Sequence, residues 1–517
     1  MMDELYFPDL GDGRYRNPVL FCDYSDPDVI RVGDVYYLTA SSFNYVPGLP
    51  ILTSRDLVNW ELRNYALEEV PAPGYELPRH ACGVWAPAIR WHDEFFYIFF
   101  GMPDEGIYMV RAKDALGAWE KPVLVLAGKG LIDPCPFWDE DGRAYVIHGY
   151  ANSRIGFKSW LGMFPISLDG TRAIGEDHLI FDGTKDQPTI EGPKVYRRNG
   201  WYYIFAPAGG VATGWQTVLR SRSIRGPYEA RIVLRQGDSC VNGPHQGAWV
   251  NTPDGQDWFL HFQSRGLYGR ILHLQPMTWN EDDWPVIGAP VAGETWGTPV
   301  EDFRKPSGPE AAPLSLQASD DFPGRLGLQW QFMGNRAEGF YSFTDGGLRL
   351  HAVKQPDDSG LMWHCPNVLT QKIACAAFTA EVEVDASGLR PGEQAGVALI
   401  GGQYAYAALR REQDGLRLVY VESEGAQHTE IIHESVADAA DKLSFRLTLL
   451  PTGYDTAALT FEYGQAGRWH WLGKPFQPER HTWVGVRLGL FVMPLGGDGG
   501  GYADFGCFRV TGVETAE

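Results

Sequence analysis

The stretch YSDPDVIRVGDVYYLT (residues 24–39) contains a strand, a two-residue turn at Gly33-Asp34 and a second, aromatic strand. Two carboxylates, Asp26 and Asp28, flank a proline at the head of the first strand. Aspartate and proline are both unfavourable in strands. The position of these acids therefore requires an explanation other than strand formation.

The turn and its aromatic strand recur along the first part of the chain. The five copies are GDVYYLTAS (33–41), HDEFFYIFFG (92–101), EDGRAYVIHG (140–149), RNGWYYIFAP (198–207) and PDGQDWFLHF (253–262). Successive copies are 59, 48, 58 and 55 residues apart, measured between the turn residues Asp34, Asp93, Asp141, Asn199 and Asp254. Repeats of about this length, built from short antiparallel strands, are typical of β-propellers. The sequence therefore predicts an all-β chain that begins with a five-bladed β-propeller, over residues 1–302.

The sequence changes character after this propeller. Residues 303–317 (FRKPSGPEAAPLSLQ) are rich in proline and show no strand pattern, which predicts a linker. Residues 318–517 again contain regularly spaced strands, such as FTAEVEVDA (378–386) and LSFRLTLLP (443–451), but without the repeated turn. This second pattern predicts a β-sandwich domain.

The overall charge excludes several classes of partner. The chain of 517 residues has a formal net charge of −21, and no cluster of Lys and Arg provides a basic face for nucleic acid. An acidic protein also repels anionic membranes, and the chain lacks the run of about 18 apolar residues that a membrane span needs. We therefore expect neither a nucleic-acid nor a membrane partner. The charge is compatible with a neutral substrate such as a sugar.

The cysteines indicate the redox compartment. There are seven, an odd number, and none is separated from another by the CxxC spacing of a zinc site or redox motif. The N-terminal residues MMDELYFPDLGDG also lack the basic and apolar segments of a signal peptide. We therefore expect a cytoplasmic protein with reduced thiols. The sequence leaves the oligomeric state open and allows a homo-oligomer.

The repeat allows one position to be compared across the five blades. The residue eight places before each turn residue is Asp26, Trp85, Asp133, Glu191 and Gln246, with His245 beside the last. The local strings agree: SDPDVI, VWAPAI, IDPCPF, IEGPKV and PHQGAW. In a propeller the first strand of each blade lines the central channel. These residues are therefore predicted to meet at one mouth of the channel.

Three carboxylates at one position in the ring indicate a catalytic site. Like charges at short range raise at least one pKa and oppose folding, so they are seldom placed together without a function. One acid and one base across a sugar ring form the arrangement of glycoside hydrolysis. A tryptophan in the same ring can stack on the C–H face of a sugar.

The motifs DPDVIRVGDVYYLTASSF, GVWAPAIRW, IDPCPFWDEDGRAYV and IEGPKVY resemble those of glycoside hydrolase family 43, from residue 17 to about residue 290. The second half, with SDDF near residue 319 and PNVLTQK (366–372), is similar to the concanavalin-like β-sandwich of that family's β-xylosidases. The resemblance implies an inverting exo-glycosidase that releases xylose, and in some relatives arabinose, from short oligosaccharides. It implies no required cofactor.

The resemblance also implies roles for single residues. Asp26 matches the general base, Glu191 the general acid, and Asp133 the carboxylate that orients the acid and raises its pKa. Around them, the resemblance implies substrate contacts from Phe43, Trp85, Arg270 and Gln246. We expect Asp28, two residues past the shared position, to be structural.

His245 matches a histidine that holds a calcium ion or a water molecule beneath the substrate in many relatives. Because Ca²⁺ prefers six to eight oxygen ligands, water would have to supply most of them. The sequence thus leaves calcium near His245 as an open alternative. The loop APAGGVATGWQ (206–216) departs from the family pattern AEGGT, which leaves the identity of the sugar open.

Three other functions remain as alternatives. The chain could be primarily an α-L-arabinofuranosidase, or a carbohydrate-binding propeller without catalysis, although all three carboxylates are present. A retaining enzyme that acts on fructosides would carry the strings WMNDPN, RDP and EC, which are absent. The sandwich could also bind polysaccharide as a module.

Overall fold

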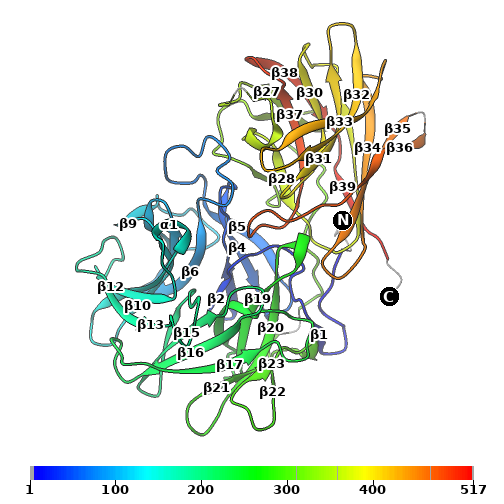
Figure 1. Ribbon diagram of the computed structural model, residues 1–517. Coiled ribbons are helices and arrows are strands. Elements are labelled where there is room, and N and C mark those ends of the chain that lie inside the picture. The colour runs from blue at the N-terminus through cyan, green and yellow to red at the C-terminus, as the bar shows by residue number, and fades with distance from the viewer. Residues whose placement is uncertain (1–4, 310, 358, 466, 515–517) are drawn as a thin grey trace.

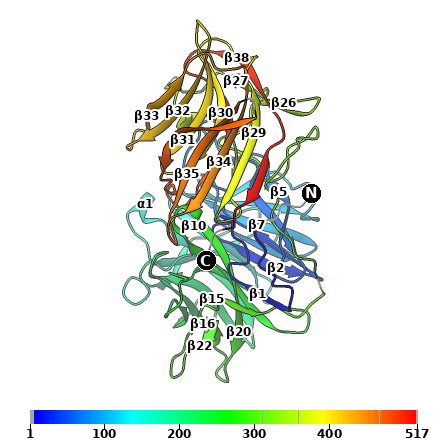
Figure 2. The same ribbon diagram turned by 90° about the vertical axis from the view of Figure 1, so that its right-hand side faces the viewer.

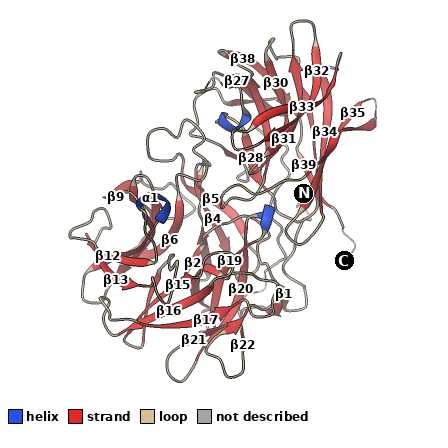
Figure 3. Ribbon diagram, in the orientation of Figure 1, coloured by secondary structure: helices blue, strands red, loops and turns tan. Residues whose placement is uncertain are grey.

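The computed structural model describes residues 5–309, 311–357, 359–465 and 467–514 (Figure 1). Strands make up both domains, and the helices are short (Figure 3). Among the described residues, no helix has the length and apolar character needed to cross a membrane. The all-β prediction is confirmed.

The first domain is a five-bladed propeller, as predicted. Each blade is an antiparallel sheet of four consecutive strands. The first two blades are β2 (Asp28–Val32), β3 (Val35–Thr39), β4 (Gly48–Ser54) and β5 (Glu61–Leu67), then β6 (Trp85–His92), β7 (Phe95–Met102), β8 (Gly106–Ala112) and β9 (Val123–Ala127). The third blade is β10 (Leu131–Trp138), β11 (Ala144–Tyr150), β12 (Trp160–Ile166) and β13 (His178–Asp182). The last two are β14 (Lys194–Arg198), β15 (Trp201–Ala208), β16 (Trp215–Ser221) and β17 (Glu229–Arg235), then β18 (His245–Asn251), β19 (Asp257–Ser264), β20 (Arg270–Trp279) and β21 (Pro285–Ile287). The short strands β22 (Ala289–Pro290) and β23 (Gly297–Thr298) extend the fourth blade.

The repeated turn joins the first two strands of each blade. In the first blade Val32 pairs with Val35, so Gly33 and Asp34 form a two-residue hairpin loop, and Gly33 has a φ of 61°. In the fourth blade Asn199 and Gly200 both have positive φ, as a type I′ turn requires. The aromatic strand that follows each turn places alternate residues in the core between blades. Tyr36 and Leu38, for example, are buried in β3.

The second domain is a sandwich of two antiparallel sheets. One sheet has the order β25 (Gln331–Phe332), β28 (Leu369–Lys372), β37 (Arg487–Pro494), β30 (Glu393–Ile400), β31 (Tyr404–Arg411), β32 (Leu416–Glu424) and β33 (Thr429–Val436). The other has the order β26 (Tyr341–Thr344), β27 (Gly347–Val353), β38 (Gly499–Phe505), β29 (Phe378–Asp385), β34 (Lys442–Pro451), β35 (Ala457–Gln465) and β36 (Arg468–Phe476), with β39 (Arg509–Gly512) paired to β29. Figures 1 and 2 show this domain on one side of the propeller.

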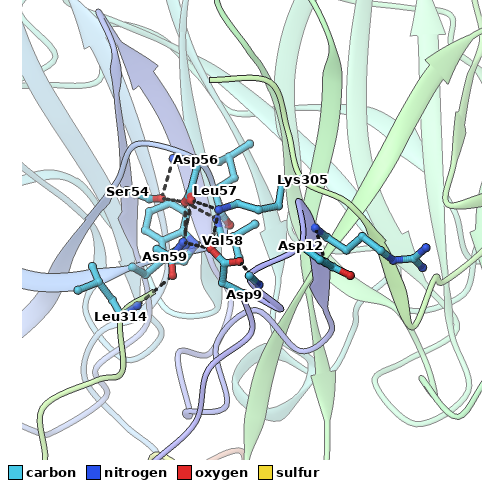
Figure 4. Close-up of polar contacts among 12 residues, drawn as sticks. Asp9, Asp12, Ser54, Asp56, Leu57, Val58, Asn59, Lys305 and Leu314 are labelled. Atoms are coloured by element: carbon cyan, nitrogen blue, oxygen red, sulfur yellow. Dashed lines mark hydrogen bonds and ion pairs between the residues drawn. The ribbon is translucent and has the colours of Figure 1, made fainter. Parts of the chain in front are cut away.

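The segment predicted as a linker is held against the propeller at its start. Strand β24 (Asp302–Arg304) pairs with β1 (Arg14–Arg16). Next to it, the ammonium group of Lys305 contacts two buried carboxylates, Asp9 at 2.5 Å and Asp56 at 3.0 Å (Figure 4). The side-chain amide of Asn59 donates to the same two carboxylates, and its Oδ1 atom accepts the backbone N–H of Leu314. The N-terminal segment, the first blade and the linker thus meet at one polar cluster.

Replacing Lys305 by methionine should destabilise the protein, because Asp9 and Asp56 would be left buried without their cation. Removing one partner of a buried ion pair costs roughly 3–5 kcal/mol. Burial opposes ionisation of Asp9, but hydrogen bonds from Lys305 and Asn59 lower its pKa below the usual value. The contribution is therefore present at neutral pH and lost as the pH falls. Thermal unfolding of Lys305→Met and wild type at pH 7 and pH 3 should show a difference that shrinks at the lower pH.

Candidate active site

The three predicted carboxylates meet at the inner strands of the propeller. Asp26 precedes β2, Asp133 lies in β10, and Glu191 precedes β14. Burial and the charges of Glu191 and Asp26 raise the pKa of Asp133 well above its usual value. The backbone N–H of Gly192, next to Glu191, donates to Asp133 Oδ2 at 2.8 Å. The ring predicted from the repeat is therefore present in the structure.

An unusual backbone conformation aims these side chains. Asp26, Asp133 and Gln246 have φ values of 54°, 57° and 28°, in the region that L-residues seldom adopt. The pairing of β10 shifts between Ile132 and Cys135, and that of β18 shifts around Gln246. Bulges of this kind redirect side chains and are frequent beside active sites. The shared sequence position is therefore also a shared bend in the inner strands.

Asp26 is buried beside a cation. Its Oδ1 atom lies 2.5 Å from Nη1 of Arg270, which begins β20 in the last blade. Its Oδ2 atom accepts hydrogen bonds from the hydroxyls of Ser25 and Ser41, both at 2.7 Å. Arg270 therefore lies at the site and not in a surface ion pair. The carboxylate of Asp26 is thus held in one orientation by a guanidinium and two hydroxyls.

Glu191 is the most accessible of the three acids. Its side chain is 25% exposed, whereas that of Asp26 is 6% exposed and Asp133 is 3% exposed overall. Its Oε1 atom lies 2.9 Å from Nε2 of His245. An acid that protonates a departing sugar must reach the open side of the site, and Glu191 meets that requirement.

Several buried polar atoms around the carboxylates lack a partner among the described residues. They are Nδ1 of His245, Oε1 of Gln246 and Nε of Arg270. Gln246 uses its other side-chain atom, Nε2, to donate to Asp133 at 3.3 Å. Buried polar groups are normally hydrogen-bonded, so unpaired ones mark where a ligand or an ordered water fits. Three of the residues predicted to bind substrate or metal therefore offer free hydrogen-bonding capacity.

Aromatic side chains form the wall of the site. Trp85 and Phe43 belong to one buried cluster, and the backbone of Phe43 pairs with Val84. The indole of Trp85 meets Trp483, from the sandwich, edge to face at 4.7 Å, and the guanidinium of Arg154 lies 5.3 Å from its ring centroid. Trp85 and Phe43 therefore lie in the same cluster, and Trp85 is held between the third blade and the second domain, while their contact with substrate stays a prediction.

The sandwich reaches the site through the loop between β36 and β37, which the sequence analysis did not identify. Trp483 comes from this loop, and Nη1 of Arg480 donates to Ser264 Oγ at 2.5 Å. Ser264 lies opposite Arg270 in the β19–β20 pair. In the sequence, the loop RHTWVG (480–485) stands out only as an irregular segment that combines an arginine with a tryptophan. No other feature of the sequence indicates that this loop reaches the propeller.

Asp28 is structural, as expected. Its Oδ2 atom accepts from the backbone N–H of Ile89 at 2.8 Å and from Arg90 at 2.7 Å. The side chain is fully buried. It therefore ties the first blade to the second.

The donors around His245 do not form a calcium site by themselves. Among the described residues, the group of three or more carboxylate, histidine or cysteine ligands that could hold a metal ion is Glu422, Glu424 and His433, far along the chain in the sandwich. The Nε2 atom of His245 is already used by Glu191. Because Ca²⁺ needs six to eight oxygens, only an ion held mainly by water would fit here.

The chain matches two family models in succession. The model of glycosyl hydrolases family 43 matches residues 15–285, and that of the β-xylosidase C-terminal concanavalin A-like domain matches residues 319–511. A putative β-xylosidase of Xylanibacter ruminicola is 44% identical over 388 residues, which cover 74% of this chain and 70% of that protein. A β-xylosidase of Formosa agariphila is 31% identical over 538 residues, covering 93% and 88%.

Two further relatives extend the comparison. A non-reducing end α-L-arabinofuranosidase of Bacteroides ovatus is 29% identical over 448 residues, covering 80% of this chain and 78% of that protein. The crystal structure of a family 43 protein from Bacillus licheniformis superposes with a TM-score of 0.82 at 26% identity, covering 97% of this chain and all of that one. The similarity thus extends over both domains.

Replacing Asp133 by asparagine should stabilise the protein while reducing activity. The fold raises the pKa of Asp133, so stability is greatest below the unfolded-state value of about 4 and declines as the pH rises. Asparagine carries no charge and can still accept the bond from Gly192. We expect the melting temperature of Asp133→Asn to exceed that of wild type at pH 8 but not at pH 4. An equal difference at both pH values would contradict this explanation.

Proposed function

The chain belongs to glycosyl hydrolase family 43 and is a glycosidase of the β-xylosidase type, and on that premise we propose that it is an inverting, exo-acting enzyme. It releases xylose from the non-reducing end of short xylo-oligosaccharides or arabinoxylo-oligosaccharides. The observation that carries this proposal is the ring of three carboxylates with distinct surroundings. Asp26 is buried beside Arg270, Asp133 has a raised pKa, and Glu191 is partly open.

Each carboxylate has one role in the proposed reaction. Asp26 accepts a proton from a water molecule while the oxygen of that water bonds to the anomeric carbon from one face of the sugar. Glu191 gives its proton to the glycosidic oxygen as the bond from that oxygen to the anomeric carbon breaks. Inversion requires roughly 6.5–9.5 Å between the two carboxyl groups, so that the water fits.

Asp133 supplies the electrostatic condition for this reaction. Burial and the charges of Glu191 and Asp26 raise the pKa of Asp133 well above its usual value, so Asp133 keeps a proton that an isolated aspartate would lose. In this proposal Asp133 lies beside Glu191, orients it and helps to keep a proton at the site for the acid step. The hydrogen bonds from Gly192 and Gln246 fix Asp133 in place.

The exo mode and the sugar specificity are supported by the loops around the site. The sandwich loop places Trp483 against Trp85 and Arg480 against Ser264, so it covers two sides of the mouth. A pocket closed in this way favours attack at a chain end. The 206–216 segment contains the end of β15, a loop and the start of β16, and the carbonyl of its Pro207 accepts from the backbone N–H of Glu191. A change of sequence in that segment can therefore alter which sugar is bound beside Glu191.

Calcium near His245, a cytoplasmic location and a homo-oligomeric state remain predictions. All seven cysteines are free thiols, and four of them, Cys22, Cys135, Cys365 and Cys375, are buried. Free buried thiols support a reducing compartment. The unpaired Nδ1 atom of His245 supports a bound water or a hydrated ion.

The acid and the base should respond differently to the leaving group. Glu191→Gln should lose about 10²-fold or more of kcat on xylobiose but little on 2,4-dinitrophenyl β-D-xylopyranoside, whose leaving group needs no proton. Asp26→Asn should lose activity on both substrates, because water is no longer activated. If either variant keeps near wild-type activity on xylobiose, the assignment of acid and base is wrong. If the wild type itself does not hydrolyse xylobiose or the aryl xyloside, the alternative of a non-catalytic binding propeller is favoured.

A comparison of two pentosides distinguishes the two enzyme activities. We expect kcat/KM on aryl β-D-xylopyranoside to exceed that on aryl α-L-arabinofuranoside by roughly tenfold or more. The reverse order would identify the chain as primarily an α-L-arabinofuranosidase. Proton NMR of the first product should show inverted anomeric configuration, and a retained configuration would contradict the proposed mechanism.

A further inference from the structure

Asp23, three residues before the proposed base, joins the two domains at the catalytic centre. The residue is buried, with 4% of its surface exposed. Its Oδ1 atom accepts the backbone N–H of Arg270 at 2.8 Å, and its Oδ2 atom accepts the backbone N–H of Gly485 at 2.9 Å. Arg270 belongs to the last blade, whereas Gly485 belongs to the sandwich loop that carries Trp483. One carboxylate therefore bridges the propeller and the sandwich.

A second bond from the sandwich reaches the same residue. The ammonium group of Lys372, the last residue of β28, donates to the backbone carbonyl of Asp23. Burial lowers the pKa of Lys372, and the charge of Asp23 opposes that effect. The guanidinium of Arg480 also interacts electrostatically with the carboxylate of Asp23. Arg270, Lys372 and Arg480 are thus among the charged groups near Asp23, and Lys372 and Arg480 come from the sandwich.

Two glycines allow this close approach. A Cβ atom on Gly269 would lie 2.5 Å from Cγ of Asp23, and one on Gly485 would lie 2.7 Å from the carbonyl oxygen of Tyr268. Val486 continues the contact by donating its N–H to the carbonyl of Leu267 at 2.8 Å. The backbones of the two domains therefore meet directly over the Asp23 carboxylate, with no room for a side chain.

The contacts form a continuous path to the base. Asp23 fixes the main chain of Arg270, and the guanidinium of Arg270 contacts Asp26 and Ser25. We propose that Asp23 is a positioning residue that couples docking of the sandwich to the alignment of Arg270 with Asp26. This inference rests on the proposed function, because it assigns Asp26 the role of base.

The competing explanation is that Asp23 only stabilises the fold. Asp320 provides a matched comparison, because it is also a buried aspartate, 5% exposed, that accepts bonds from two backbone N–H groups and one indole. Its hydrogen-bond donors, Phe322, Gly327 and Trp330, all belong to the sandwich. A purely structural aspartate should behave like Asp320 when it is replaced.

The test compares Asp23→Asn with Asp320→Asn by kinetics and thermal unfolding. In Asp23→Asn one carboxylate oxygen becomes an amide that faces an N–H donor, so one of the two bridging bonds is lost. We expect kcat/KM on aryl β-D-xylopyranoside to fall by about tenfold or more, because small displacements at a catalytic centre have large effects. The acidic limb of the pH profile should move to higher pH, because Arg270 is held less firmly beside Asp26. Asp320→Asn should lower the melting temperature while kcat, KM and that limb stay unchanged.

A second variant keeps the test decisive if Asp23→Asn does not fold. Gly485→Ala leaves Asp23 intact but introduces a methyl group against the backbone of Tyr268 and Gly269, which separates the domains at this point. We expect the same shift of the acidic limb. Wild-type kinetics in Gly485→Ala and in any folded Asp23→Asn, with only a lower melting temperature, would overturn the inference. Absence of pentoside turnover by the wild type would instead overturn the proposed function and this inference with it.

Discussion

The ion pair between Asp26 and Arg270 joins the first and last blades of the propeller at the proposed catalytic site. The chain of the propeller closes into a ring at this boundary, where Leu20 also pairs with Leu272. Both side chains of the ion pair are less than one-tenth exposed, so breaking the pair would leave a buried charge at a cost of roughly 3–5 kcal/mol. Ring closure and the environment of the base therefore depend on the same contact.

The surroundings of the other two carboxylates, Asp133 and Glu191, oppose folding. Asp133 is buried among negative groups, and positive φ values occur at Asp26, Asp133 and Gln246. Such features persist only where the surrounding structure enforces them. Here the surroundings include the fixed spacing of the blades and the backbone amide of Gly192, which donates to Asp133. The site is thus less favourable for stability than the blades that support it, which is expected for groups that serve chemistry.

The sequence predicted the propeller and its ring of carboxylates because both follow from a repeat. Equivalent positions in a repeated blade must meet around one axis, so Asp26, Asp133 and Glu191 could be placed together without coordinates. It could not predict contacts that have no repeat behind them. The hydrogen bond of His245 to Glu191 depends on side-chain direction across two blades, and the approach of Trp483 depends on how one domain docks.

The division into two domains describes the sequence better than it describes the active site. The two family models match residues 15–285 and 319–511, with a short segment between them. The indole beside Trp85 nevertheless comes from the second domain, as do the amide of Gly485 and the ammonium group of Lys372 at Asp23. A propeller without the sandwich would leave Asp23 with one bonded carboxylate oxygen and Trp85 with one side open. The sandwich is therefore a structural part of the proposed catalytic centre, and its loop at 480–485 contacts that site as the inner strands do.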